Sequence, residues 1–130
     1  EVFESYGTIR FINLFPVVLR AIATGGTLVV DEFDASLHPM ALMSIINVFH
    51  NDDINKKRAQ LIFNTHDVSL LDLDYFRRDQ IYFVEKNNLT GVTDLYSLDE
   101  FSPRKTENIR KGYLVGKYGA TPGIEIEEVE

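Results

Sequence analysis

The pattern of apolar and polar positions predicts a long helix at the start of the chain. Apolar residues recur at helical spacing between residues 9 and 23. They are Ile12, Phe15, Leu19 and Ala23. Pro16 lies inside this stretch, where it could kink or interrupt the helix, and Gly25-Gly26 marks its end. The pattern therefore predicts a mostly buried helix that ends before residue 25.

Two short apolar runs follow, separated by a second amphipathic stretch. Thr27–Val30 has no polar alternation, which is typical of a central parallel strand buried on both faces, and Gln60–Asn64 is a similar run. Between them, Pro39–His50 predicts a helix with Pro39 at its first position, and residues 51–58 form a polar loop. Strands that alternate with helices indicate an α/β unit with a mainly parallel sheet flanked by helices.

The second half of the chain predicts a different arrangement. A short helix is expected over Ser69–Leu73, and two strands over Gln80–Glu85 and Thr93–Ser97, joined as a hairpin by a turn at Asn87-Asn88. A helix within residues 98–113 follows. We expect it to carry four basic side chains, Arg104, Lys105, Arg110 and Lys111.

Composition narrows the class of protein. The chain has 130 residues, a net charge of −7 and 45% hydrophobic residues, the balance of a folded domain. It contains no cysteine, which excludes disulfide scaffolds and thiolate metal sites, and no apolar run long enough for a membrane span. We therefore expect a cytoplasmic protein with no membrane partner. The negative net charge argues against a protein that binds nucleic acid over its whole surface.

Polar side chains follow both predicted parallel strands. Asp31 and Glu32 follow the first strand, and His66 follows the second. Because ligands of open α/β sheets bind beyond the carboxyl ends of the strands, we expect the chemistry at this edge. Adjacent carboxylates diverge, so one can hold a hard cation while the other contacts a water molecule. Solvated acids and a structural histidine are the alternative interpretation.

A third candidate lies directly before the first helix. Ser5 is a typical N-cap residue, and Gly7 permits close approach of the backbone to a ligand. A helix N-terminus with free N–H groups binds phosphate readily, although an ordinary capped helix start has the same sequence features.

Four segments together resemble the C-terminal half of an ABC-type ATPase head, as in SMC, RecF and OLD-like proteins. Residues 28–32 (LVVDE) resemble a Walker B strand, and residues 33–39 (FDASLHP) resemble the D-loop. Residues 64–67 (NTHD) resemble the switch-histidine loop, and residues 5–8 (SYGT) a variant signature loop. Residues 31–39 and 113–124 are similar, more narrowly, to AAA-labelled ATPases of bacterial abortive-infection and phage-defence systems.

The resemblance implies a partial P-loop NTPase fold and a role for each site residue. Asp31 would hold Mg²⁺, Glu32 would act as general base on the attacking water, and His66 would contact the γ-phosphate of ATP. Ser5 and Gly7 would close over the nucleotide of a second head, with Asp34 at the seam of the homodimer. The parent protein would couple ATP hydrolysis to an effector such as a nuclease.

The sequence also departs from the resemblance. No G-x-x-x-x-G-K-[ST] motif occurs in it, so the lysine and backbone amides that hold the β- and γ-phosphates are missing. Since the first residue is Glu1 and not Met, we expect a fragment that lacks the Walker A half and is inactive alone. Its domain would span residues 1–124, followed by an acidic tail over residues 125–130.

Two other functions remain open at this stage. A metal-dependent nuclease could use Asp31, Glu32, Asp34 and either His66 or His38, provided that these side chains converge on metal ions. A non-catalytic interaction module is the second alternative. The basic residues of the last helix could contact DNA, but no aromatic residues are interleaved with them for base stacking.

Overall fold

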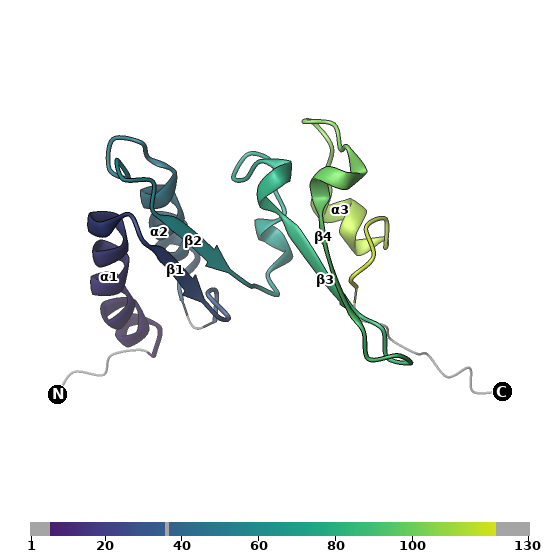
Figure 1. The fold of residues 1–130 in the computed structure, drawn as a ribbon, viewed down its shortest axis with the longest axis horizontal. Coiled ribbons are helices and arrows are strands. Elements are labelled where there is room, and N and C mark those ends of the chain that lie inside the picture. Colours follow the sequence, from purple (N-terminus) through teal and green to yellow (C-terminus); the bar gives the residue numbers. More distant parts are fainter. Residues whose placement is uncertain (1–5, 36, 122–130) are drawn as a thin grey trace. The chain divides into compact units, whose positions relative to one another are not determined.

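The computed structural model describes residues 6–35 and 37–121, with the side chains of residues 6–10 left out. The chain divides into two compact units, unit 1 (Glu1–Asp67) and unit 2 (Val68–Glu130), drawn from purple to yellow along the sequence in Figure 1. No helix in the described part of the chain has the length and apolarity that a membrane span requires.

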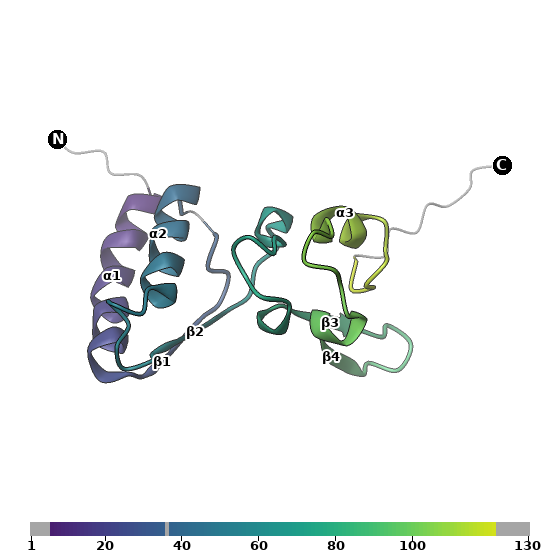
Figure 2. The same cartoon turned by 90° about the horizontal axis from the view of Figure 1, so that it is seen from above.

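Unit 1 is a small α/β unit. Its elements are α1 (Tyr6–Thr24), β1 (Thr27–Val30), α2 (Pro39–His50) and β2 (Gln60–Phe63). The two strands pair in parallel, from Thr27 opposite Gln60 to Val30 opposite Phe63. Both helices lie on the same side of the strands (Figure 2). The predicted helix over Pro39–His50 and the two parallel strands are confirmed, and β2 ends one residue earlier than expected.

The core of unit 1 lies between the helices and one face of the strands. Its buried apolar residues are Val18, Ala21, Phe33, Leu37, Leu42, Ile45, Ile46 and Ala59. The outer face of the strands is open, since Val29 is 70% exposed and its neighbour Ile62 is 55% exposed. The prediction of a strand buried on both faces is therefore wrong, because both helices of unit 1 cover the same face.

Helix α1 also differs from the prediction of a mostly buried helix. Only one side of it contacts the strands and α2, so Val18 and Ala21 are buried while Ile12 and Leu19 are at least half exposed. Pro16 does not interrupt it, since α1 continues to Thr24.

Unit 2 is built around an antiparallel hairpin. Its elements are η1 (Val68–Leu70), η2 (Arg78–Gln80), β3 (Tyr82–Lys86), β4 (Thr93–Ser97), η3 (Leu98–Phe101) and α3 (Ile109–Leu114). The predicted hairpin is confirmed, with Tyr82 opposite Ser97.

The predicted basic helix is only partly present in unit 2. Arg110 and Lys111 lie on α3, but Arg104 and Lys105 lie before it. Ser102 adopts a left-handed conformation (φ 46°) after η3, and Asn108 caps the start of α3 by accepting a hydrogen bond from the Lys111 N–H. The four cations therefore do not form one helical face.

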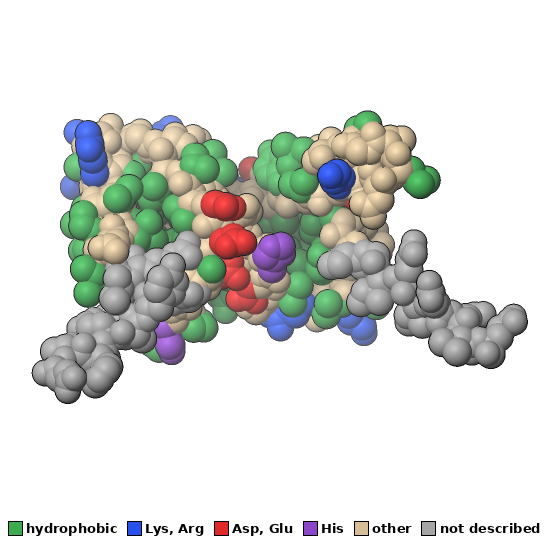
Figure 3. All heavy atoms as spheres, turned by 90° about the horizontal axis from the view of Figure 1, so that it is seen from below, with side chains coloured by type: hydrophobic (Ala, Val, Ile, Leu, Met, Phe, Trp, Pro, Cys, Tyr) green, Lys and Arg blue, Asp and Glu red, His purple; other side chains and the backbone are tan. Residues whose placement is uncertain are grey.

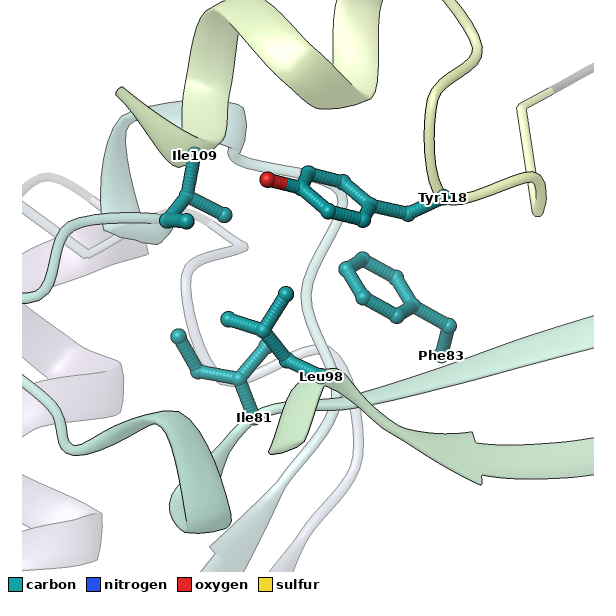
Figure 4. Close-up of a cluster of buried hydrophobic side chains, with 5 residues drawn as sticks. All are labelled: Ile81, Phe83, Leu98, Ile109 and Tyr118. Carbon is teal, nitrogen blue, oxygen red and sulfur yellow. The ribbon is translucent and has the colours of Figure 1, made fainter. Parts of the chain in front are cut away.

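The core of unit 2 is rich in aromatic contacts. Ile81, Phe83, Leu98, Ile109 and Tyr118 are buried together (Figure 4). The rings of Phe83 and Tyr118 are stacked with their centroids 5.6 Å apart. The Tyr96 hydroxyl donates to the Tyr118 carbonyl oxygen at 2.6 Å. Helix α3 is thus packed against the hairpin through Ile109 and through Tyr118, which follows the helix.

A polar contact closes the edge of this core. The Tyr118 hydroxyl donates to the Glu107 carboxylate, which also pairs with the Lys117 ammonium at 3.1 Å. The hydrogen bonds from Tyr118 and Lys117 lower the pKa of Glu107. Burial, reinforced by the Glu107 carboxylate, raises the pKa of Tyr118.

Candidate functional site

The parallel register of β1 and β2 brings their carboxyl ends together. Val30 lies opposite Phe63, so the next residues along the two strands, Asp31 and Asn64, become neighbours. The Asn64 Nδ2 donates to the Asp31 Oδ1 at 2.6 Å. A polar contact therefore forms at this edge between Asp31 and the residue that follows β2.

Glu32 lies in an unusual backbone conformation directly after Asp31. Its φ of 50° is in the left-handed region, which an L-residue with a side chain rarely adopts. The Glu32 N–H donates to Asn64 Oδ1, and the Glu32 carbonyl accepts from the Ala35 N–H at 2.9 Å. The chain thus turns sharply at Glu32, directly after Asp31.

A buried phenylalanine anchors the turn that carries these acids. Phe33 is fully buried, and its ring centroid is 4.9 Å from that of Phe63 on β2. Leu37 is also buried. The exposed acids Asp31 and Glu32 therefore project from a segment fixed by apolar packing on one side, and Asp34 lies half-buried within the same segment.

His66 follows β2 on an exposed part of the chain. It is two residues beyond Asn64, and the Thr65 Oγ1 next to it accepts from the Asp67 N–H at 2.9 Å. Figure 3 shows acidic side chains gathered on one face, with a histidine side chain in the same view. The strands thus place Asp31, Glu32 and His66 at the same edge of the sheet of unit 1.

The other predicted site residues have different positions. Ser5 lies outside the described residues, and Gly7 is in the first turn of α1. His38 caps α2, because its Nδ1 accepts from the Met40 N–H at 3.1 Å. One of the two histidines that the nuclease alternative could use is therefore engaged at a helix start.

The donor set fits Mg²⁺ held together with phosphate groups. Magnesium in nucleotide sites is bound by one or two carboxylates, and its remaining ligands are water and phosphate oxygens. Asp31 supplies one exposed carboxylate of this kind. Within the described ranges, no three His, Asp or Glu side chains lie close enough to form a metal cage.

The sequence does not predict a role for Asn64. It predicts Asn64 as the last residue of an apolar strand, whereas β2 ends at Phe63 and the Asn64 side chain contacts both residues of the acidic pair. The available signal was the position itself, since Asn64 is a polar residue that ends an apolar run directly before Thr65-His66.

Comparison with known proteins identifies a family. Residues 1–72 match the family described as "AAA domain, putative AbiEii toxin, Type IV TA system". The chain belongs to this family. The match confirms the predicted likeness to AAA-labelled ATPases, a nucleotide-binding class, and it includes the whole of unit 1. No curated protein and no solved structure matches the chain.

Proposed function

We propose that this AAA domain is the acid-bearing part of an ABC-type ATPase head with a P-loop NTPase fold, related to SMC, RecF and OLD-like proteins. The observation that carries the proposal is the meeting of Asp31, Glu32 and Asn64 at the carboxyl ends of two adjacent parallel strands, with His66 two residues farther on. Ligands of α/β sheets bind at this edge.

Each residue has a distinct part in the proposed reaction. Asp31 binds Mg²⁺, which neutralises charge on the β- and γ-phosphates of ATP when bound. Glu32, which lies at the turn with a φ of 50°, orients the attacking water and accepts its proton. His66 donates a hydrogen bond to the γ-phosphate. Because phosphoryl transfer depends mainly on positioning and charge neutralisation, this set of side chains suits the reaction.

A second head completes the site in this proposal. Ser5 and Gly7 contact the γ-phosphate held by the partner head, since Gly7 lies in the first turn of α1, where backbone N–H groups are unpaired within a helix. Asp34, in the turn after Glu32, lies at the seam of the homodimer. ATP-dependent closure then drives an effector, such as a nuclease, in phage defence or DNA processing.

The 130 residues lack a P-loop motif, so the lysine and backbone amides that hold the β- and γ-phosphates have to come from another segment. We expect the isolated chain to bind ATP weakly and to hydrolyse it negligibly. If the isolated chain hydrolyses ATP and Glu32→Gln abolishes that activity, the expectation that another segment is needed to hold the phosphates is wrong.

The function is tested with Glu32→Gln in the full-length protein. The substitution removes the general base but keeps the size of the side chain, so kcat should fall at least about 100-fold. ATP binding should persist, and an ATP-bound dimer should accumulate, which light scattering after size exclusion detects. Glu100→Gln is the matched control, because Glu100 is an exposed glutamate of unit 2. Equal ATPase rates for the wild type and Glu32→Gln would refute the proposal.

A further inference from the structure

Asn64 connects to three consecutive residues of the segment after β1. Its Nδ2 donates to Asp31 Oδ1 at 2.6 Å, and its Oδ1 accepts from the Glu32 N–H. Its backbone carbonyl accepts from the Phe33 N–H at 3.3 Å. One residue at the end of β2 thus contacts the carboxylate of the first acid and the backbone of the second.

The chemistry of these contacts requires an amide. The oxygen must face the Glu32 N–H, and the NH₂ group must face the Asp31 carboxylate. In the reversed amide, the NH₂ donor would face the N–H donor, and the amide oxygen would face the carboxylate oxygen, so neither hydrogen bond could form. An ionised aspartate cannot donate, and an apolar side chain of the same shape can do neither. Asparagine is therefore matched to both neighbours at once.

The conformation of Glu32 depends on its surroundings. A residue with a Cβ in the left-handed region costs about 1 kcal/mol or more, and such residues persist only where neighbouring groups fix them. Two hydrogen bonds help to hold this conformation, one from the Glu32 N–H to Asn64 and one from the Ala35 N–H to the Glu32 carbonyl. The Asn64 side chain therefore contributes to the backbone conformation from which the Glu32 side chain starts.

We propose that Asn64 is a positioning residue for ATP hydrolysis, an inference that rests on the function proposed above. It fixes the Asp31 carboxylate for the cation and the Glu32 backbone for activation of water. The Asn64 side chain is itself exposed, so its removal leaves no cavity in the core of unit 1. Partners that orient metal ligands and catalytic groups in this way typically contribute about 10- to 100-fold to activity.

Two substitutions separate the two contacts. Asn64→Ala removes both of them. Asn64→Asp keeps an acceptor for the Glu32 N–H but loses the donor to Asp31. Asn47→Ala is the control, since Asn47 is an exposed asparagine on α2. Hydrogen exchange of the Glu32 amide is measured by NMR on the 130-residue chain, and kcat, KM for ATP and the Mg²⁺ requirement are measured in the full-length protein.

We expect Asn64→Ala to lower kcat about 10- to 100-fold, with KM for ATP nearly unchanged and a higher Mg²⁺ concentration at half-maximal rate. The Glu32 amide should exchange at least about tenfold faster. Asn64→Asp should lower kcat while the Glu32 amide stays protected, and Asn47→Ala should match the wild type in every measurement.

Two results would overturn the inference: an unchanged exchange rate of the Glu32 amide in Asn64→Ala, or an unchanged kcat in a protein that Glu32→Gln inactivates. Failure of the proposed function has a different signature, since Glu32→Gln would then leave hydrolysis intact. In that case the inference falls with the function.

Discussion

Two polar contacts, one in each unit, lie in different surroundings. In unit 1, Asn64 contacts Asp31 and Glu32 at the exposed ends of parallel strands. In unit 2, the Tyr118 hydroxyl and the Glu107 carboxylate lie at the edge of an aromatic core. The contact in unit 1 is therefore open to a ligand, whereas the contact in unit 2 completes the packing.

The strand arrangement explains this difference. Parallel strands have their carboxyl ends at the same edge of the sheet, so the residues that follow β1 and β2 lie next to each other there. The antiparallel strands β3 and β4 end at opposite edges and are joined by a tight turn, in which the Gly91 N–H donates to the Asn87 carbonyl at 2.7 Å. We therefore expect side chains that act together on a ligand at the carboxyl ends of the strands of unit 1.

The largest effect on stability should come from the buried ring beneath the candidate site. Phe33→Ala removes a fully buried side chain that contacts Phe63, and it should destabilise unit 1 by about 3 to 5 kcal/mol. Hydrogen exchange resolved by residue should show lost protection in β1 and β2 but retained protection in β3 and β4.

The reciprocal variant is Leu98→Ala, which empties a fully buried position in unit 2 and should cost about 2 to 5 kcal/mol. Protection should then be lost in β3 and β4 first. If either variant lowers protection equally in all four strands, the units unfold as one, and the comparison between them is wrong.

The sequence predicted the elements of unit 1 well because their periodicity is local. Pro39–His50 and Thr27–Val30 were each found at their observed bounds. Burial was predicted less well, since it depends on what covers each face: the outer face with Val29 and Ile62 is exposed, although an unbroken apolar run predicts burial on both sides.

The candidate site shows the same limit. Asp31, Glu32 and His66 could be selected because each follows an apolar strand. Asn64 also follows an apolar strand, but its role depends on a side-chain contact between residues more than thirty positions apart in the chain, which the local pattern does not reveal. In unit 2, a basic helix was expected over too long a range, since the left-handed turn at Ser102 and the cap at Asn108 interrupt the pattern.

A smaller effect should come from glycines that have similar backbone angles in the two units. Gly25 has a φ of 69°, and a Cβ added there would lie 2.7 Å from the Lys57 carbonyl oxygen. Gly91, in the hairpin of unit 2, has a φ of 71° and no atom within 4 Å of the same Cβ position. Gly91→Ala should therefore cost about 1 kcal/mol from the backbone angle alone, and Gly25→Ala about 2 kcal/mol or more.

Denaturant unfolding of the two alanine variants measures this difference. The comparison tests the close approach between the residue after α1 and the loop before β2, because the φ angles of the two glycines are nearly equal. Equal losses of stability would show that the loop around Lys57 moves aside without cost.

The smallest effect should be the dependence of unit 2 on pH. Burial and the Glu107 carboxylate raise the pKa of Tyr118, and burial with Glu85 and Asp94 raises that of Tyr96. A tyrosine with a raised pKa stabilises the folded state while it is neutral, so this contribution is complete below about pH 10, the ordinary value, and is lost as the pH rises above it. The lowered pKa of Glu107 acts in the opposite direction, and its contribution is lost as the pH falls below about 4.

Tyr118→Phe tests this assignment without emptying the core. The variant keeps the ring that stacks on Phe83 but removes the hydroxyl that donates to Glu107. Thermal unfolding followed across alkaline pH should show a shallower loss of stability than in the wild type, with a remaining slope from Tyr96. Tyr82→Phe is the control, since the Tyr82 side chain is 59% exposed, and its profile should match the wild type. If Tyr118→Phe keeps the full alkaline slope, the Tyr118–Glu107 contact does not seal the core of unit 2, and the contrast with unit 1 rests on strand arrangement alone.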